Sequence, residues 1–252
     1  MTTPTRLTLI GNLLSPYVRK VVAICEIKGL AYELDPIVPF LGNEKFTALN
    51  PLRRIPILIH DGAVIADSTV IAEYLEDIAP TPAVLPTRAV DRAKARWIDE
   101  YADTRMGDVF IWSIFGKAVV APAIFGAARD LDAVNKAVRE DLPQVMDDLE
   151  KLAPAAGGLF GAYGLADIST AVHFANLRWA RQTVDAVRWP RAAAWIKRVE
   201  TETPLARVTA LAEKVLRVRP EEHRGVLTAN GVAVSASSVA GATPQRGPMT
   251  PI

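Results

Sequence analysis

The chain has 252 residues, of which half are hydrophobic and 23% are charged, as is typical of a soluble globular protein with a substantial core. The formal net charge is +1, which gives no reason to expect nucleic acid or a membrane surface as a partner. A single cysteine excludes an intramolecular disulfide, and the three histidines lack the spacing of metal ligands. We therefore expect no metal. No signal-peptide pattern and no apolar run of about 20 residues is present, which predicts a cytoplasmic protein.

The first 80 residues alternate between strand and helix patterns. In chain order they predict a strand over 6–10, a helix over 17–28, a strand over 31–37, an irregular stretch to about 49, strands over 57–60 and 63–66, and a helix over 70–78. Pro16 suits the first turn of the first helix, where its missing N–H costs nothing. Asp61-Gly62 between two apolar runs favours a hairpin. Residues 1–80 are therefore expected to form an α/β domain.

The pattern changes after residue 80. Residues 81–87 are rich in proline and threonine, which is typical of a linker. Residues 88–218 carry only helical patterns, and these predict an all-α domain. Residues 219–252 are rich in small and polar residues and lack regularly spaced large apolar ones. We expect this tail to be disordered, because it cannot bury enough apolar surface.

Ser15 lies between the first predicted strand and the first predicted helix. A helix N-terminus offers free N–H groups and about half a positive charge, which stabilises an anion such as a thiolate. A serine hydroxyl there can also donate a hydrogen bond to sulfur. Since serine is equally a preferred N-cap, local spacing leaves capping and thiol activation open.

Two further features have both a structural and a functional interpretation. Pro56 precedes a predicted strand, where a cis peptide would turn backbone groups toward a ligand, but an ordinary trans proline also fits. Asp67-Ser68 begins the next helix; the pair can hold a carboxylate and an ammonium group or simply cap the helix.

Together these features resemble the thioredoxin-like N-terminal domain of cytosolic glutathione transferases. The order is a strand, Ser15-Pro16-Tyr17, a helix, Asn50-Pro51, Arg54-Ile55-Pro56, a hairpin, and Asp67-Ser68 before a helix. The helical half is similar to the same family at Trp97–Asp103, Leu165–Ser169 and Trp189–Val199. The resemblance covers about residues 6–215. It implies a thioredoxin-like domain followed by an all-helical glutathione-transferase domain, with a serine-type, bacterial-like active site.

The resemblance also implies roles for individual residues. Ser15 would hydrogen-bond the sulfur of glutathione, the co-substrate, so that the thiolate attacks a small hydrophobic electrophile or a hydroperoxide held between the domains. The glutathione-binding residues it implies are Ser15, Arg54 for the glycyl carboxylate, Ile55 and Pro56 for the cysteinyl part, Asp67 and Ser68 for the γ-glutamyl end, and Asp103 for the partner subunit's γ-glutamyl amine. The implied second-substrate pocket contains Leu13, Leu14, Phe110 and Ser113. The family further implies a homodimer and a role in detoxification.

Three departures from the family pattern stand out. Gly164 replaces the usual serine or threonine N-cap before Leu165–Ser169, Ala48 stands where some serine-type classes have a basic residue, and the tail has no counterpart. Cys25 lies near the C-terminus of the first helix, where the dipole disfavours a thiolate, and we expect it to be buried and inert. Arg19 and Lys20 are expected to be solvated or paired at the domain interface.

Two other functions stay open. The chain could be a non-catalytic module of the same fold that binds a ligand or a protein, although such modules often lose the serine or the Asp-Ser pair that this chain keeps. Within enzymes, glutathione-dependent isomerase or dehalogenase chemistry is the other alternative, but the double-Ser-Cys loop of the isomerase class is absent.

Overall fold

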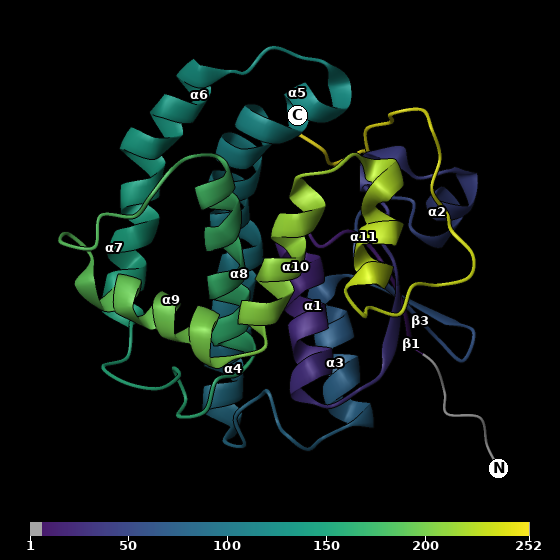
Figure 1. Ribbon diagram of the computed structural model, residues 1–252. Helices are drawn as coiled ribbons and strands as arrows, with labels where there is room; N and C mark the ends of the chain where they lie inside the picture. Colours follow the sequence, from purple (N-terminus) through teal and green to yellow (C-terminus); the bar gives the residue numbers. More distant parts are fainter. Residues whose placement is uncertain (1–6, 252) are drawn as a thin grey trace. The chain divides into compact units, whose positions relative to one another are not determined.

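A computed structural model describes residues 7–251 and divides them into two compact units (Figure 1). One unit contains the chain up to Pro82 together with Arg207–Thr250, and the other contains Ala83–Ala206. The helical unit therefore ends at 206, whereas the sequence predicted 218. Arg6 of the predicted first strand and Ile252 of the predicted tail lie outside the described residues.

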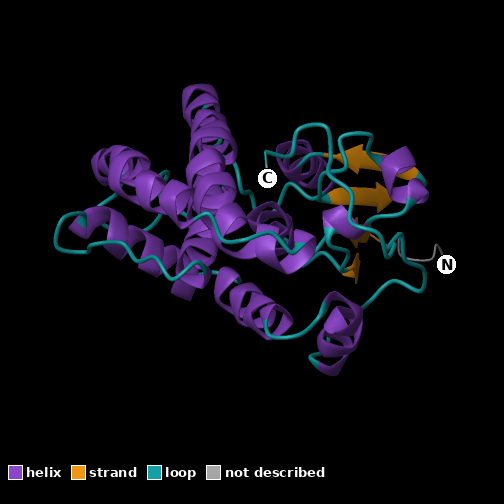
Figure 2. Ribbon diagram, turned by 90° about the horizontal axis from the view of Figure 1, so that it is seen from above, coloured by secondary structure: helices purple, strands orange, loops and turns teal. Residues whose placement is uncertain are grey.

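The first unit contains a mixed sheet of the thioredoxin-like type, whose strands are orange in Figure 2. The sheet has four strands in the order β2-β1-β3-β4. Its elements before the helical unit are β1 (Leu7–Ile10), α1 (Pro16–Ile27), β2 (Tyr32–Asp35), η1 (Pro39–Leu41), α2 (Glu44–Leu49), β3 (Ile57–His60), β4 (Ala63–Ala66) and α3 (Ser68–Ile78). β1 pairs with β2 in parallel and with β3 antiparallel, and β3 pairs antiparallel with β4. The predicted α/β order is confirmed, and the irregular stretch contains two short helices.

Apolar side chains place the core of this unit between the sheet and the α1–α3 pair. Leu9 lies opposite Leu34 on β2 and Leu58 on β3, and all three are fully buried. α1 and α3 contact each other (Figure 1), and their inward-facing side chains are buried with the strands. The predicted hairpin forms with positive φ at Asp61 and Gly62, 51° and 80°, as its tight turn requires.

The second unit is all-helical, as predicted. Its elements are α4 (Ala89–Tyr101), η2 (Ala102–Val120, π-helical), α5 (Ala121–Phe125), α6 (Leu131–Lys136), η3 (Ala137–Asp141, π-helical), α7 (Leu142–Leu152), α8 (Leu165–Trp179) and α9 (Pro190–Glu202). α4, η2 and α5 form one continuous helix, against which the buried helix α8 packs. α10 (Leu205–Leu216) begins here and continues into the first unit.

The long helix 89–125 is apolar enough to span a membrane by length and composition alone. Its most apolar window of 18 residues has a mean hydropathy of 1.6, and 39% of that window is buried. The sequence pattern alone predicted no such segment, because polar residues interrupt the apolar run. Core helices of soluble proteins share these properties, and Phe110 and Ile114 of this helix are fully buried.

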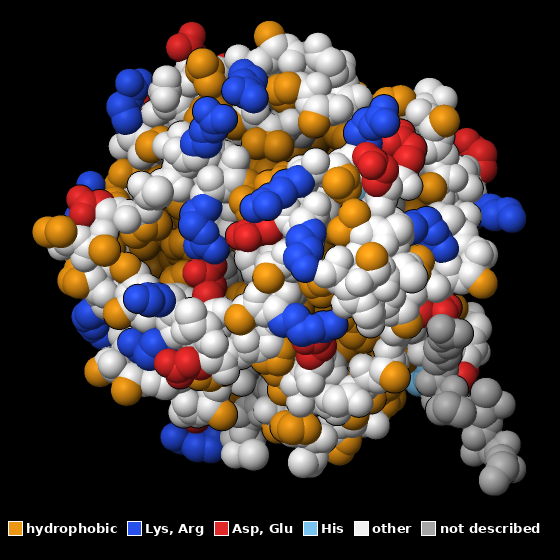
Figure 3. Space-filling model, viewed as in Figure 1, with side chains coloured by type: hydrophobic (Ala, Val, Ile, Leu, Met, Phe, Trp, Pro, Cys, Tyr) orange, Lys and Arg blue, Asp and Glu red, His pale blue; other side chains and the backbone are white. Residues whose placement is uncertain are grey.

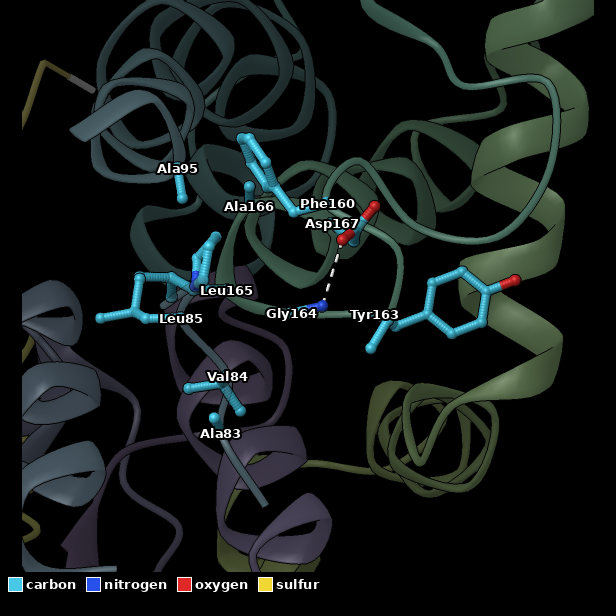
Figure 4. A pocket seen from close by; sticks show the side chains of 12 residues that line it. Ala83, Val84, Leu85, Ala95, Phe160, Tyr163, Gly164, Leu165, Ala166 and Asp167 are labelled. Atoms are coloured by element: carbon cyan, nitrogen blue, oxygen red, sulfur yellow. Dashed lines mark hydrogen bonds between the residues drawn. The ribbon is translucent and has the colours of Figure 1, made fainter. Parts of the chain in front are cut away.

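A buried carboxylate organises the start of α8 (Figure 4). Asp167 accepts hydrogen bonds from the backbone N–H of Gly164 (3.1 Å) and Leu159 (2.9 Å) and from Trp195 Nε1 (2.8 Å). Burial raises the pKa of Asp167, which these three donors oppose. A Cβ on Gly164 would lie 2.5 Å from the Val84 carbonyl oxygen. This close approach explains why glycine replaces the usual serine or threonine, and a small cavity of about 60 Å³ lies beside it.

The C-terminal segment packs against the sheet of the first unit, so the prediction of a disordered tail was wrong. It contains η4 (Pro220–Glu222), α11 (His223–Ala229) and an extended stretch (yellow in Figure 1). Leu34 N donates to Ala233 O (2.9 Å) and Ser235 N donates to Leu34 O (3.1 Å), so the segment runs parallel to β2. β2 is an edge strand, whose free backbone groups attract such pairing. Hydrogen bonds between backbone groups do not require an apolar sequence pattern, so the composition of the tail gave no sign of this pairing.

Asp35 at the end of β2 anchors this segment. The side chain is almost fully buried, and its carboxylate accepts hydrogen bonds from Arg224 Nη1 (3.0 Å), Ser238 Oγ (2.7 Å) and Val239 N (2.8 Å). Because one buried charge takes three donors from the tail, the attachment is specific in register.

Candidate functional site

Ser15 is the N-cap of α1, and Pro16 is the first helical residue. The backbone of Ser15 is extended, with φ −76° and ψ 128°, and the Ser15 carbonyl oxygen accepts from Arg19 N at 3.1 Å. The hydroxyl makes no capping hydrogen bond to the helix, and the residue is partly exposed. A hydroxyl that does not cap, at the positive end of a helix, can donate to an anion bound there.

The loop before Ser15 is fixed by polar contacts. The Asn12 carbonyl oxygen accepts from Ser15 N (3.0 Å), and Asn12 Oδ1 accepts from Leu14 N (3.0 Å). From the helix, Arg19 Nη1 donates to the Leu13 carbonyl oxygen (2.6 Å). Both Asn12 and Leu13 are buried. The backbone that enters α1 is therefore held by contacts within the loop and by a contact from the helix.

Arg19 and Lys20 of α1 are both fully buried, so the expectation that they are solvated was wrong. Lys20 Nζ lies 3.4 Å from Thr69 Oγ1 at the start of α3. Cations buried in this way are held by partners inside the protein instead of by water.

The Ile55–Pro56 peptide bond is cis, as the ligand-binding interpretation of Pro56 requires, and the ordinary trans proline is excluded. Ile55 lies against Gly11, where an added Cβ would come within 2.6 Å of Val18 and 3.1 Å of Ile55. Gly11 also has φ +151°, a conformation that favours glycine. The loop that carries Ser15 and the loop that carries Pro56 are thus in close contact.

Asp67 is the N-cap of α3, and its Oδ1 accepts from Thr69 N (2.9 Å) and Val70 N (3.2 Å). Its φ of +84° is uncommon for a residue with a side chain, and such residues cluster at functional sites. Asp67 is exposed and Ser68 is buried. The capping interpretation is confirmed, and it leaves ligand binding by this exposed helix start as a hypothesis.

The two neighbouring arginines have different environments. Arg53 is buried with φ 53° and donates to the Gly42 carbonyl oxygen at 2.8 Å. Arg54 is exposed, and its Nη2 donates to the carbonyl oxygen of Met249 in the tail at 3.2 Å. Arg53 therefore supports the α2 region, whereas Arg54 is the cation that faces solvent and the end of the tail.

The remaining residues expected at the site divide between the two units, and Asp103, Phe110 and Ser113 lie on η2 of the helical unit. Phe110 is fully buried, edge-to-face with Phe174 at 5.2 Å between ring centroids. Asp103 and Ser113 are partly exposed. In the first unit, Leu13 is buried and Leu14 is partly exposed. Within their own units Leu13 and Phe110 are core residues, and Leu14 and Ser113 are the accessible members of the expected pocket.

Cys25 is fully buried, and burial raises the pKa of its thiol to about 12. It is therefore the inert core residue that was predicted.

Among residues 7–251, no group of three or more His, Cys, Asp or Glu side chains is arranged to hold a metal ion. On the face shown in Figure 3, basic and acidic side chains are interspersed, in keeping with the small net charge.

Sequence reasoning missed Asn12 and the C-terminal residues that contact its loop. Asn12 Nδ2 lies 2.8 Å from His223 Nδ1 and 3.0 Å from the Pro36 carbonyl oxygen. An asparagine just before a helix is a common turn residue, so nothing local marked it. The partner lies 211 positions away.

Comparisons with known proteins agree with this geometry. Residues 9–83 match the family model "Glutathione S-transferase, N-terminal domain". A probable glutathione S-transferase, GSTU1, of Oryza sativa subsp. indica is 30% identical over 223 residues, covering 83% of this chain and 91% of that protein.

Solved structures show the same likeness. A glutathione S-transferase from Rhodospirillum rubrum F11 has a TM-score of 0.71 and 28% identity over 77% of this chain and 88% of its own. One from Methylobacterium radiotolerans JCM 2831, in complex with glutathione sulfonate, has a TM-score of 0.66 and 25% identity, covering 81% and 95%. With its thioredoxin-like sheet, its cis-Pro56 and its all-helical second unit, the chain belongs to the glutathione S-transferase family.

Proposed function

We propose that the protein is a glutathione transferase in which Ser15 activates the glutathione thiol. The observation that carries the proposal is the Ser15 hydroxyl, which does not cap α1 and stands at the N-terminus of that helix. The loop around it is held by the backbone and side chain of Asn12 and by Arg19. Such fixed donors stabilise a developing anion without reorganisation.

In this proposal glutathione lies along the loops of the first unit. Ile55, before cis-Pro56, pairs its backbone with the cysteinyl part, and Asp67 with Ser68 binds the γ-glutamyl end. Arg54 binds the glycyl carboxylate in place of the Met249 carbonyl. The complex of the Methylobacterium relative with glutathione sulfonate supports the choice of ligand. Asp103 is assigned to the partner subunit's γ-glutamyl amine, and Leu13, Leu14, Phe110 and Ser113 to the second substrate.

The energies are sufficient for thiol activation. Lowering a thiol pKa from about 8.5 to about 6.5 requires about 2.7 kcal/mol. One hydrogen bond to a charged group supplies about 1.5–3 kcal/mol, and a helix N-terminus supplies about 0.3–1 kcal/mol. The thiol proton goes to solvent, and the thiolate then forms a bond to an electrophilic carbon as a leaving group departs. With a hydroperoxide it attacks the terminal oxygen instead, and the O–O bond breaks to give the sulfenic acid of glutathione and an alkoxide that takes a proton from solvent.

The test is the Ser15→Ala variant, with Ser237→Ala as the control because Ser237 is exposed in the same unit. We expect the pKa of the bound thiol, followed by thiolate absorbance, to rise by about one to two units, and kcat for an aryl halide to fall at least about tenfold. The Ser237→Ala protein should match the wild type. Unchanged turnover in Ser15→Ala refutes the assignment. Retention on immobilised glutathione without turnover of any electrophile or hydroperoxide would favour the non-catalytic module.

We also propose a cytoplasmic homodimer. The helix α4 leaves Trp97 59% exposed and Val90 51% exposed, and large exposed apolar side chains on one element are typical of an association surface. Light scattering at micromolar concentration should give twice the mass of the chain, and a monomer there contradicts the proposal.

A further inference from the structure

A buried hydrogen bond joins the loop before Ser15 to the C-terminal segment. Asn12 Nδ2 and His223 Nδ1 are 2.8 Å apart, and both residues are 2% exposed. His223 is the first residue of α11, and the next residue, Arg224, is held by the Asp35 carboxylate at 3.0 Å. The ring is therefore fixed by the same anchor that attaches the tail.

The hydrogen-bond partners determine which way the Asn12 amide points. Leu14 N–H can only donate, so the atom that it contacts at 3.0 Å is the amide oxygen. The Pro36 carbonyl can only accept, so the atom 3.0 Å from it is the amide nitrogen. That nitrogen carries two hydrogens, one for Pro36 and one for His223.

The state of the imidazole follows from the same geometry. Because the Asn12 amide nitrogen can only donate, His223 Nδ1 must accept, which requires a neutral ring with its proton on Nε2. A protonated ring would present a second donor to the amide. Only the neutral form keeps the contact.

Asn12 is also the residue that sets the backbone entering α1, since its carbonyl oxygen accepts from Ser15 N at 3.0 Å. We propose that Asn12 and His223 are positioning residues, in which the neutral His223 ring holds the Asn12 side chain and thereby places the Ser15 hydroxyl at the thiol. The inference rests on the proposed role of Ser15. It gives the C-terminal segment a part in catalysis through His223, which acts by way of Asn12.

The surroundings of His223 determine how this device responds to pH. Burial lowers the pKa of His223, whereas nearby carboxylates and carbonyls favour the protonated ring. The Glu221 and Glu222 carboxylates and the carbonyls of Pro36 and Val218 act on the ring, and the Arg224–Asp35 ion pair begins at the next residue along the chain. When His223 takes up a proton, the loop before Ser15 loses the hydrogen bond between Asn12 and His223, and activation of the thiol falls. This loss adds to the loss of thiolate that follows from protonation of the thiol itself.

The experiment compares two variants of the full chain. His223→Gln offers an amide oxygen that accepts from Asn12 and does not titrate, whereas His223→Leu offers no acceptor. We expect His223→Leu to raise the pKa of the bound glutathione thiol by about one unit and to lower kcat/KM for glutathione by about tenfold, the order of one lost buried hydrogen bond. His223→Gln should restore most of both. A structural role alone would not produce this difference in the pKa of the bound thiol.

A second measurement is independent of turnover. Nitrogen-15 NMR of the histidine rings reports the tautomer, and His60→Gln and His223→Gln assign the signals among the three histidines. We expect the His223 ring to be neutral and protonated on Nε2 at neutral pH. Asn12→Asp replaces the donor with an acceptor, so it should raise the pKa of His223 and weaken thiol activation. This variant also serves if His223→Leu fails to fold.

The outcomes separate the two proposals. A proton on His223 Nδ1 at neutral pH overturns the positioning role, and so does a folded His223→Leu or Asn12→Asp protein with an unchanged pKa of the bound thiol. A wild-type protein that binds glutathione without lowering its thiol pKa overturns the role of Ser15, and the positioning role with it.

Discussion

Replacement of Asp35 by asparagine should release the C-terminal segment from the sheet. The Asp35 carboxylate is the acceptor for Arg224, Ser238 and Val239, at 2.7–3.0 Å. Asparagine has nearly the same shape but no charge, and its NH2 group would face one of these donors. The variant therefore removes the charge that holds the tail while leaving the packing volume unchanged.

The magnitude follows from the burial of the two partners. Breaking a fully buried ion pair costs about 3–5 kcal/mol. Here the side chain of Asp35 is 3% exposed but that of Arg224 is 36% exposed, so part of the arginine charge is recovered by water. We expect a loss of about 2–3 kcal/mol, which corresponds to an increase of about 30-fold to 150-fold in the local opening of the tail.

Hydrogen exchange measures this opening directly. The amides of Ser235 and Asn43, which donate to Leu34 and Val239, should exchange faster by that factor in Asp35→Asn. The amides of β3, which pair with β1 and β4, should keep their protection. Asp61→Asn is the control, because the Asp61 side chain is 64% exposed in the hairpin turn.

The reasoning is refuted if Ser235 keeps its protection in Asp35→Asn. It is also refuted if β3 loses protection to the same extent as Ser235. In that case the carboxylate would support the whole unit instead of the tail.

Two other predictions concern stability. Gly164→Ser, which an N-cap preference alone would favour, should destabilise the protein by about 1–3 kcal/mol, because the new Cβ meets the Val84 carbonyl oxygen at 2.5 Å. Gly225→Ala is the control, because nothing lies within 4 Å of the added Cβ, and its thermal unfolding midpoint should match that of the wild type. Equal midpoints for the two variants would contradict the steric argument. Burial lowers the pKa of His223 from its ordinary 6.5, so the unfolded chain takes up this proton first and the free energy of unfolding falls as the pH drops below that value. Denaturant unfolding at about pH 7 and pH 5 should show a smaller loss in His223→Gln, and an equal loss would exclude the linkage.

Local patterns predicted the first unit closely, because its elements depend on nearby residues. The strands Ile57–His60 and Ala63–Ala66 and the turn between them follow from two apolar runs around Asp61-Gly62. α1 begins at Pro16 and α3 follows the Asp67 cap, as N-terminal helix signals predict. For the same reason Ser15, Pro56 and Asp67 could be chosen as candidates before any contact was known.

Local patterns did not predict the residues whose environment is determined by long-range contacts. Arg19 and Lys20 look like surface residues in the sequence, yet the fold buries both. Gly164 looks like a poor cap until the Val84 backbone is placed against it. In both cases the neighbour that matters lies in another element, and the residue type alone carries no signal of it.

By itself, then, the sequence determined the order of strands and helices, the all-helical second half, and a serine at the head of the first helix. Those features depend on hydrophobic periodicity, caps and turns, which act over a few residues. Only the tertiary structure decided that the tail pairs with β2 and that His223 contacts the loop before Ser15. A backbone ladder on β2, a buried Asp35 and an amide facing His223 join residues about 200 positions apart. Such pairs form because the fold leaves an unpaired strand edge and buried polar groups that must find partners.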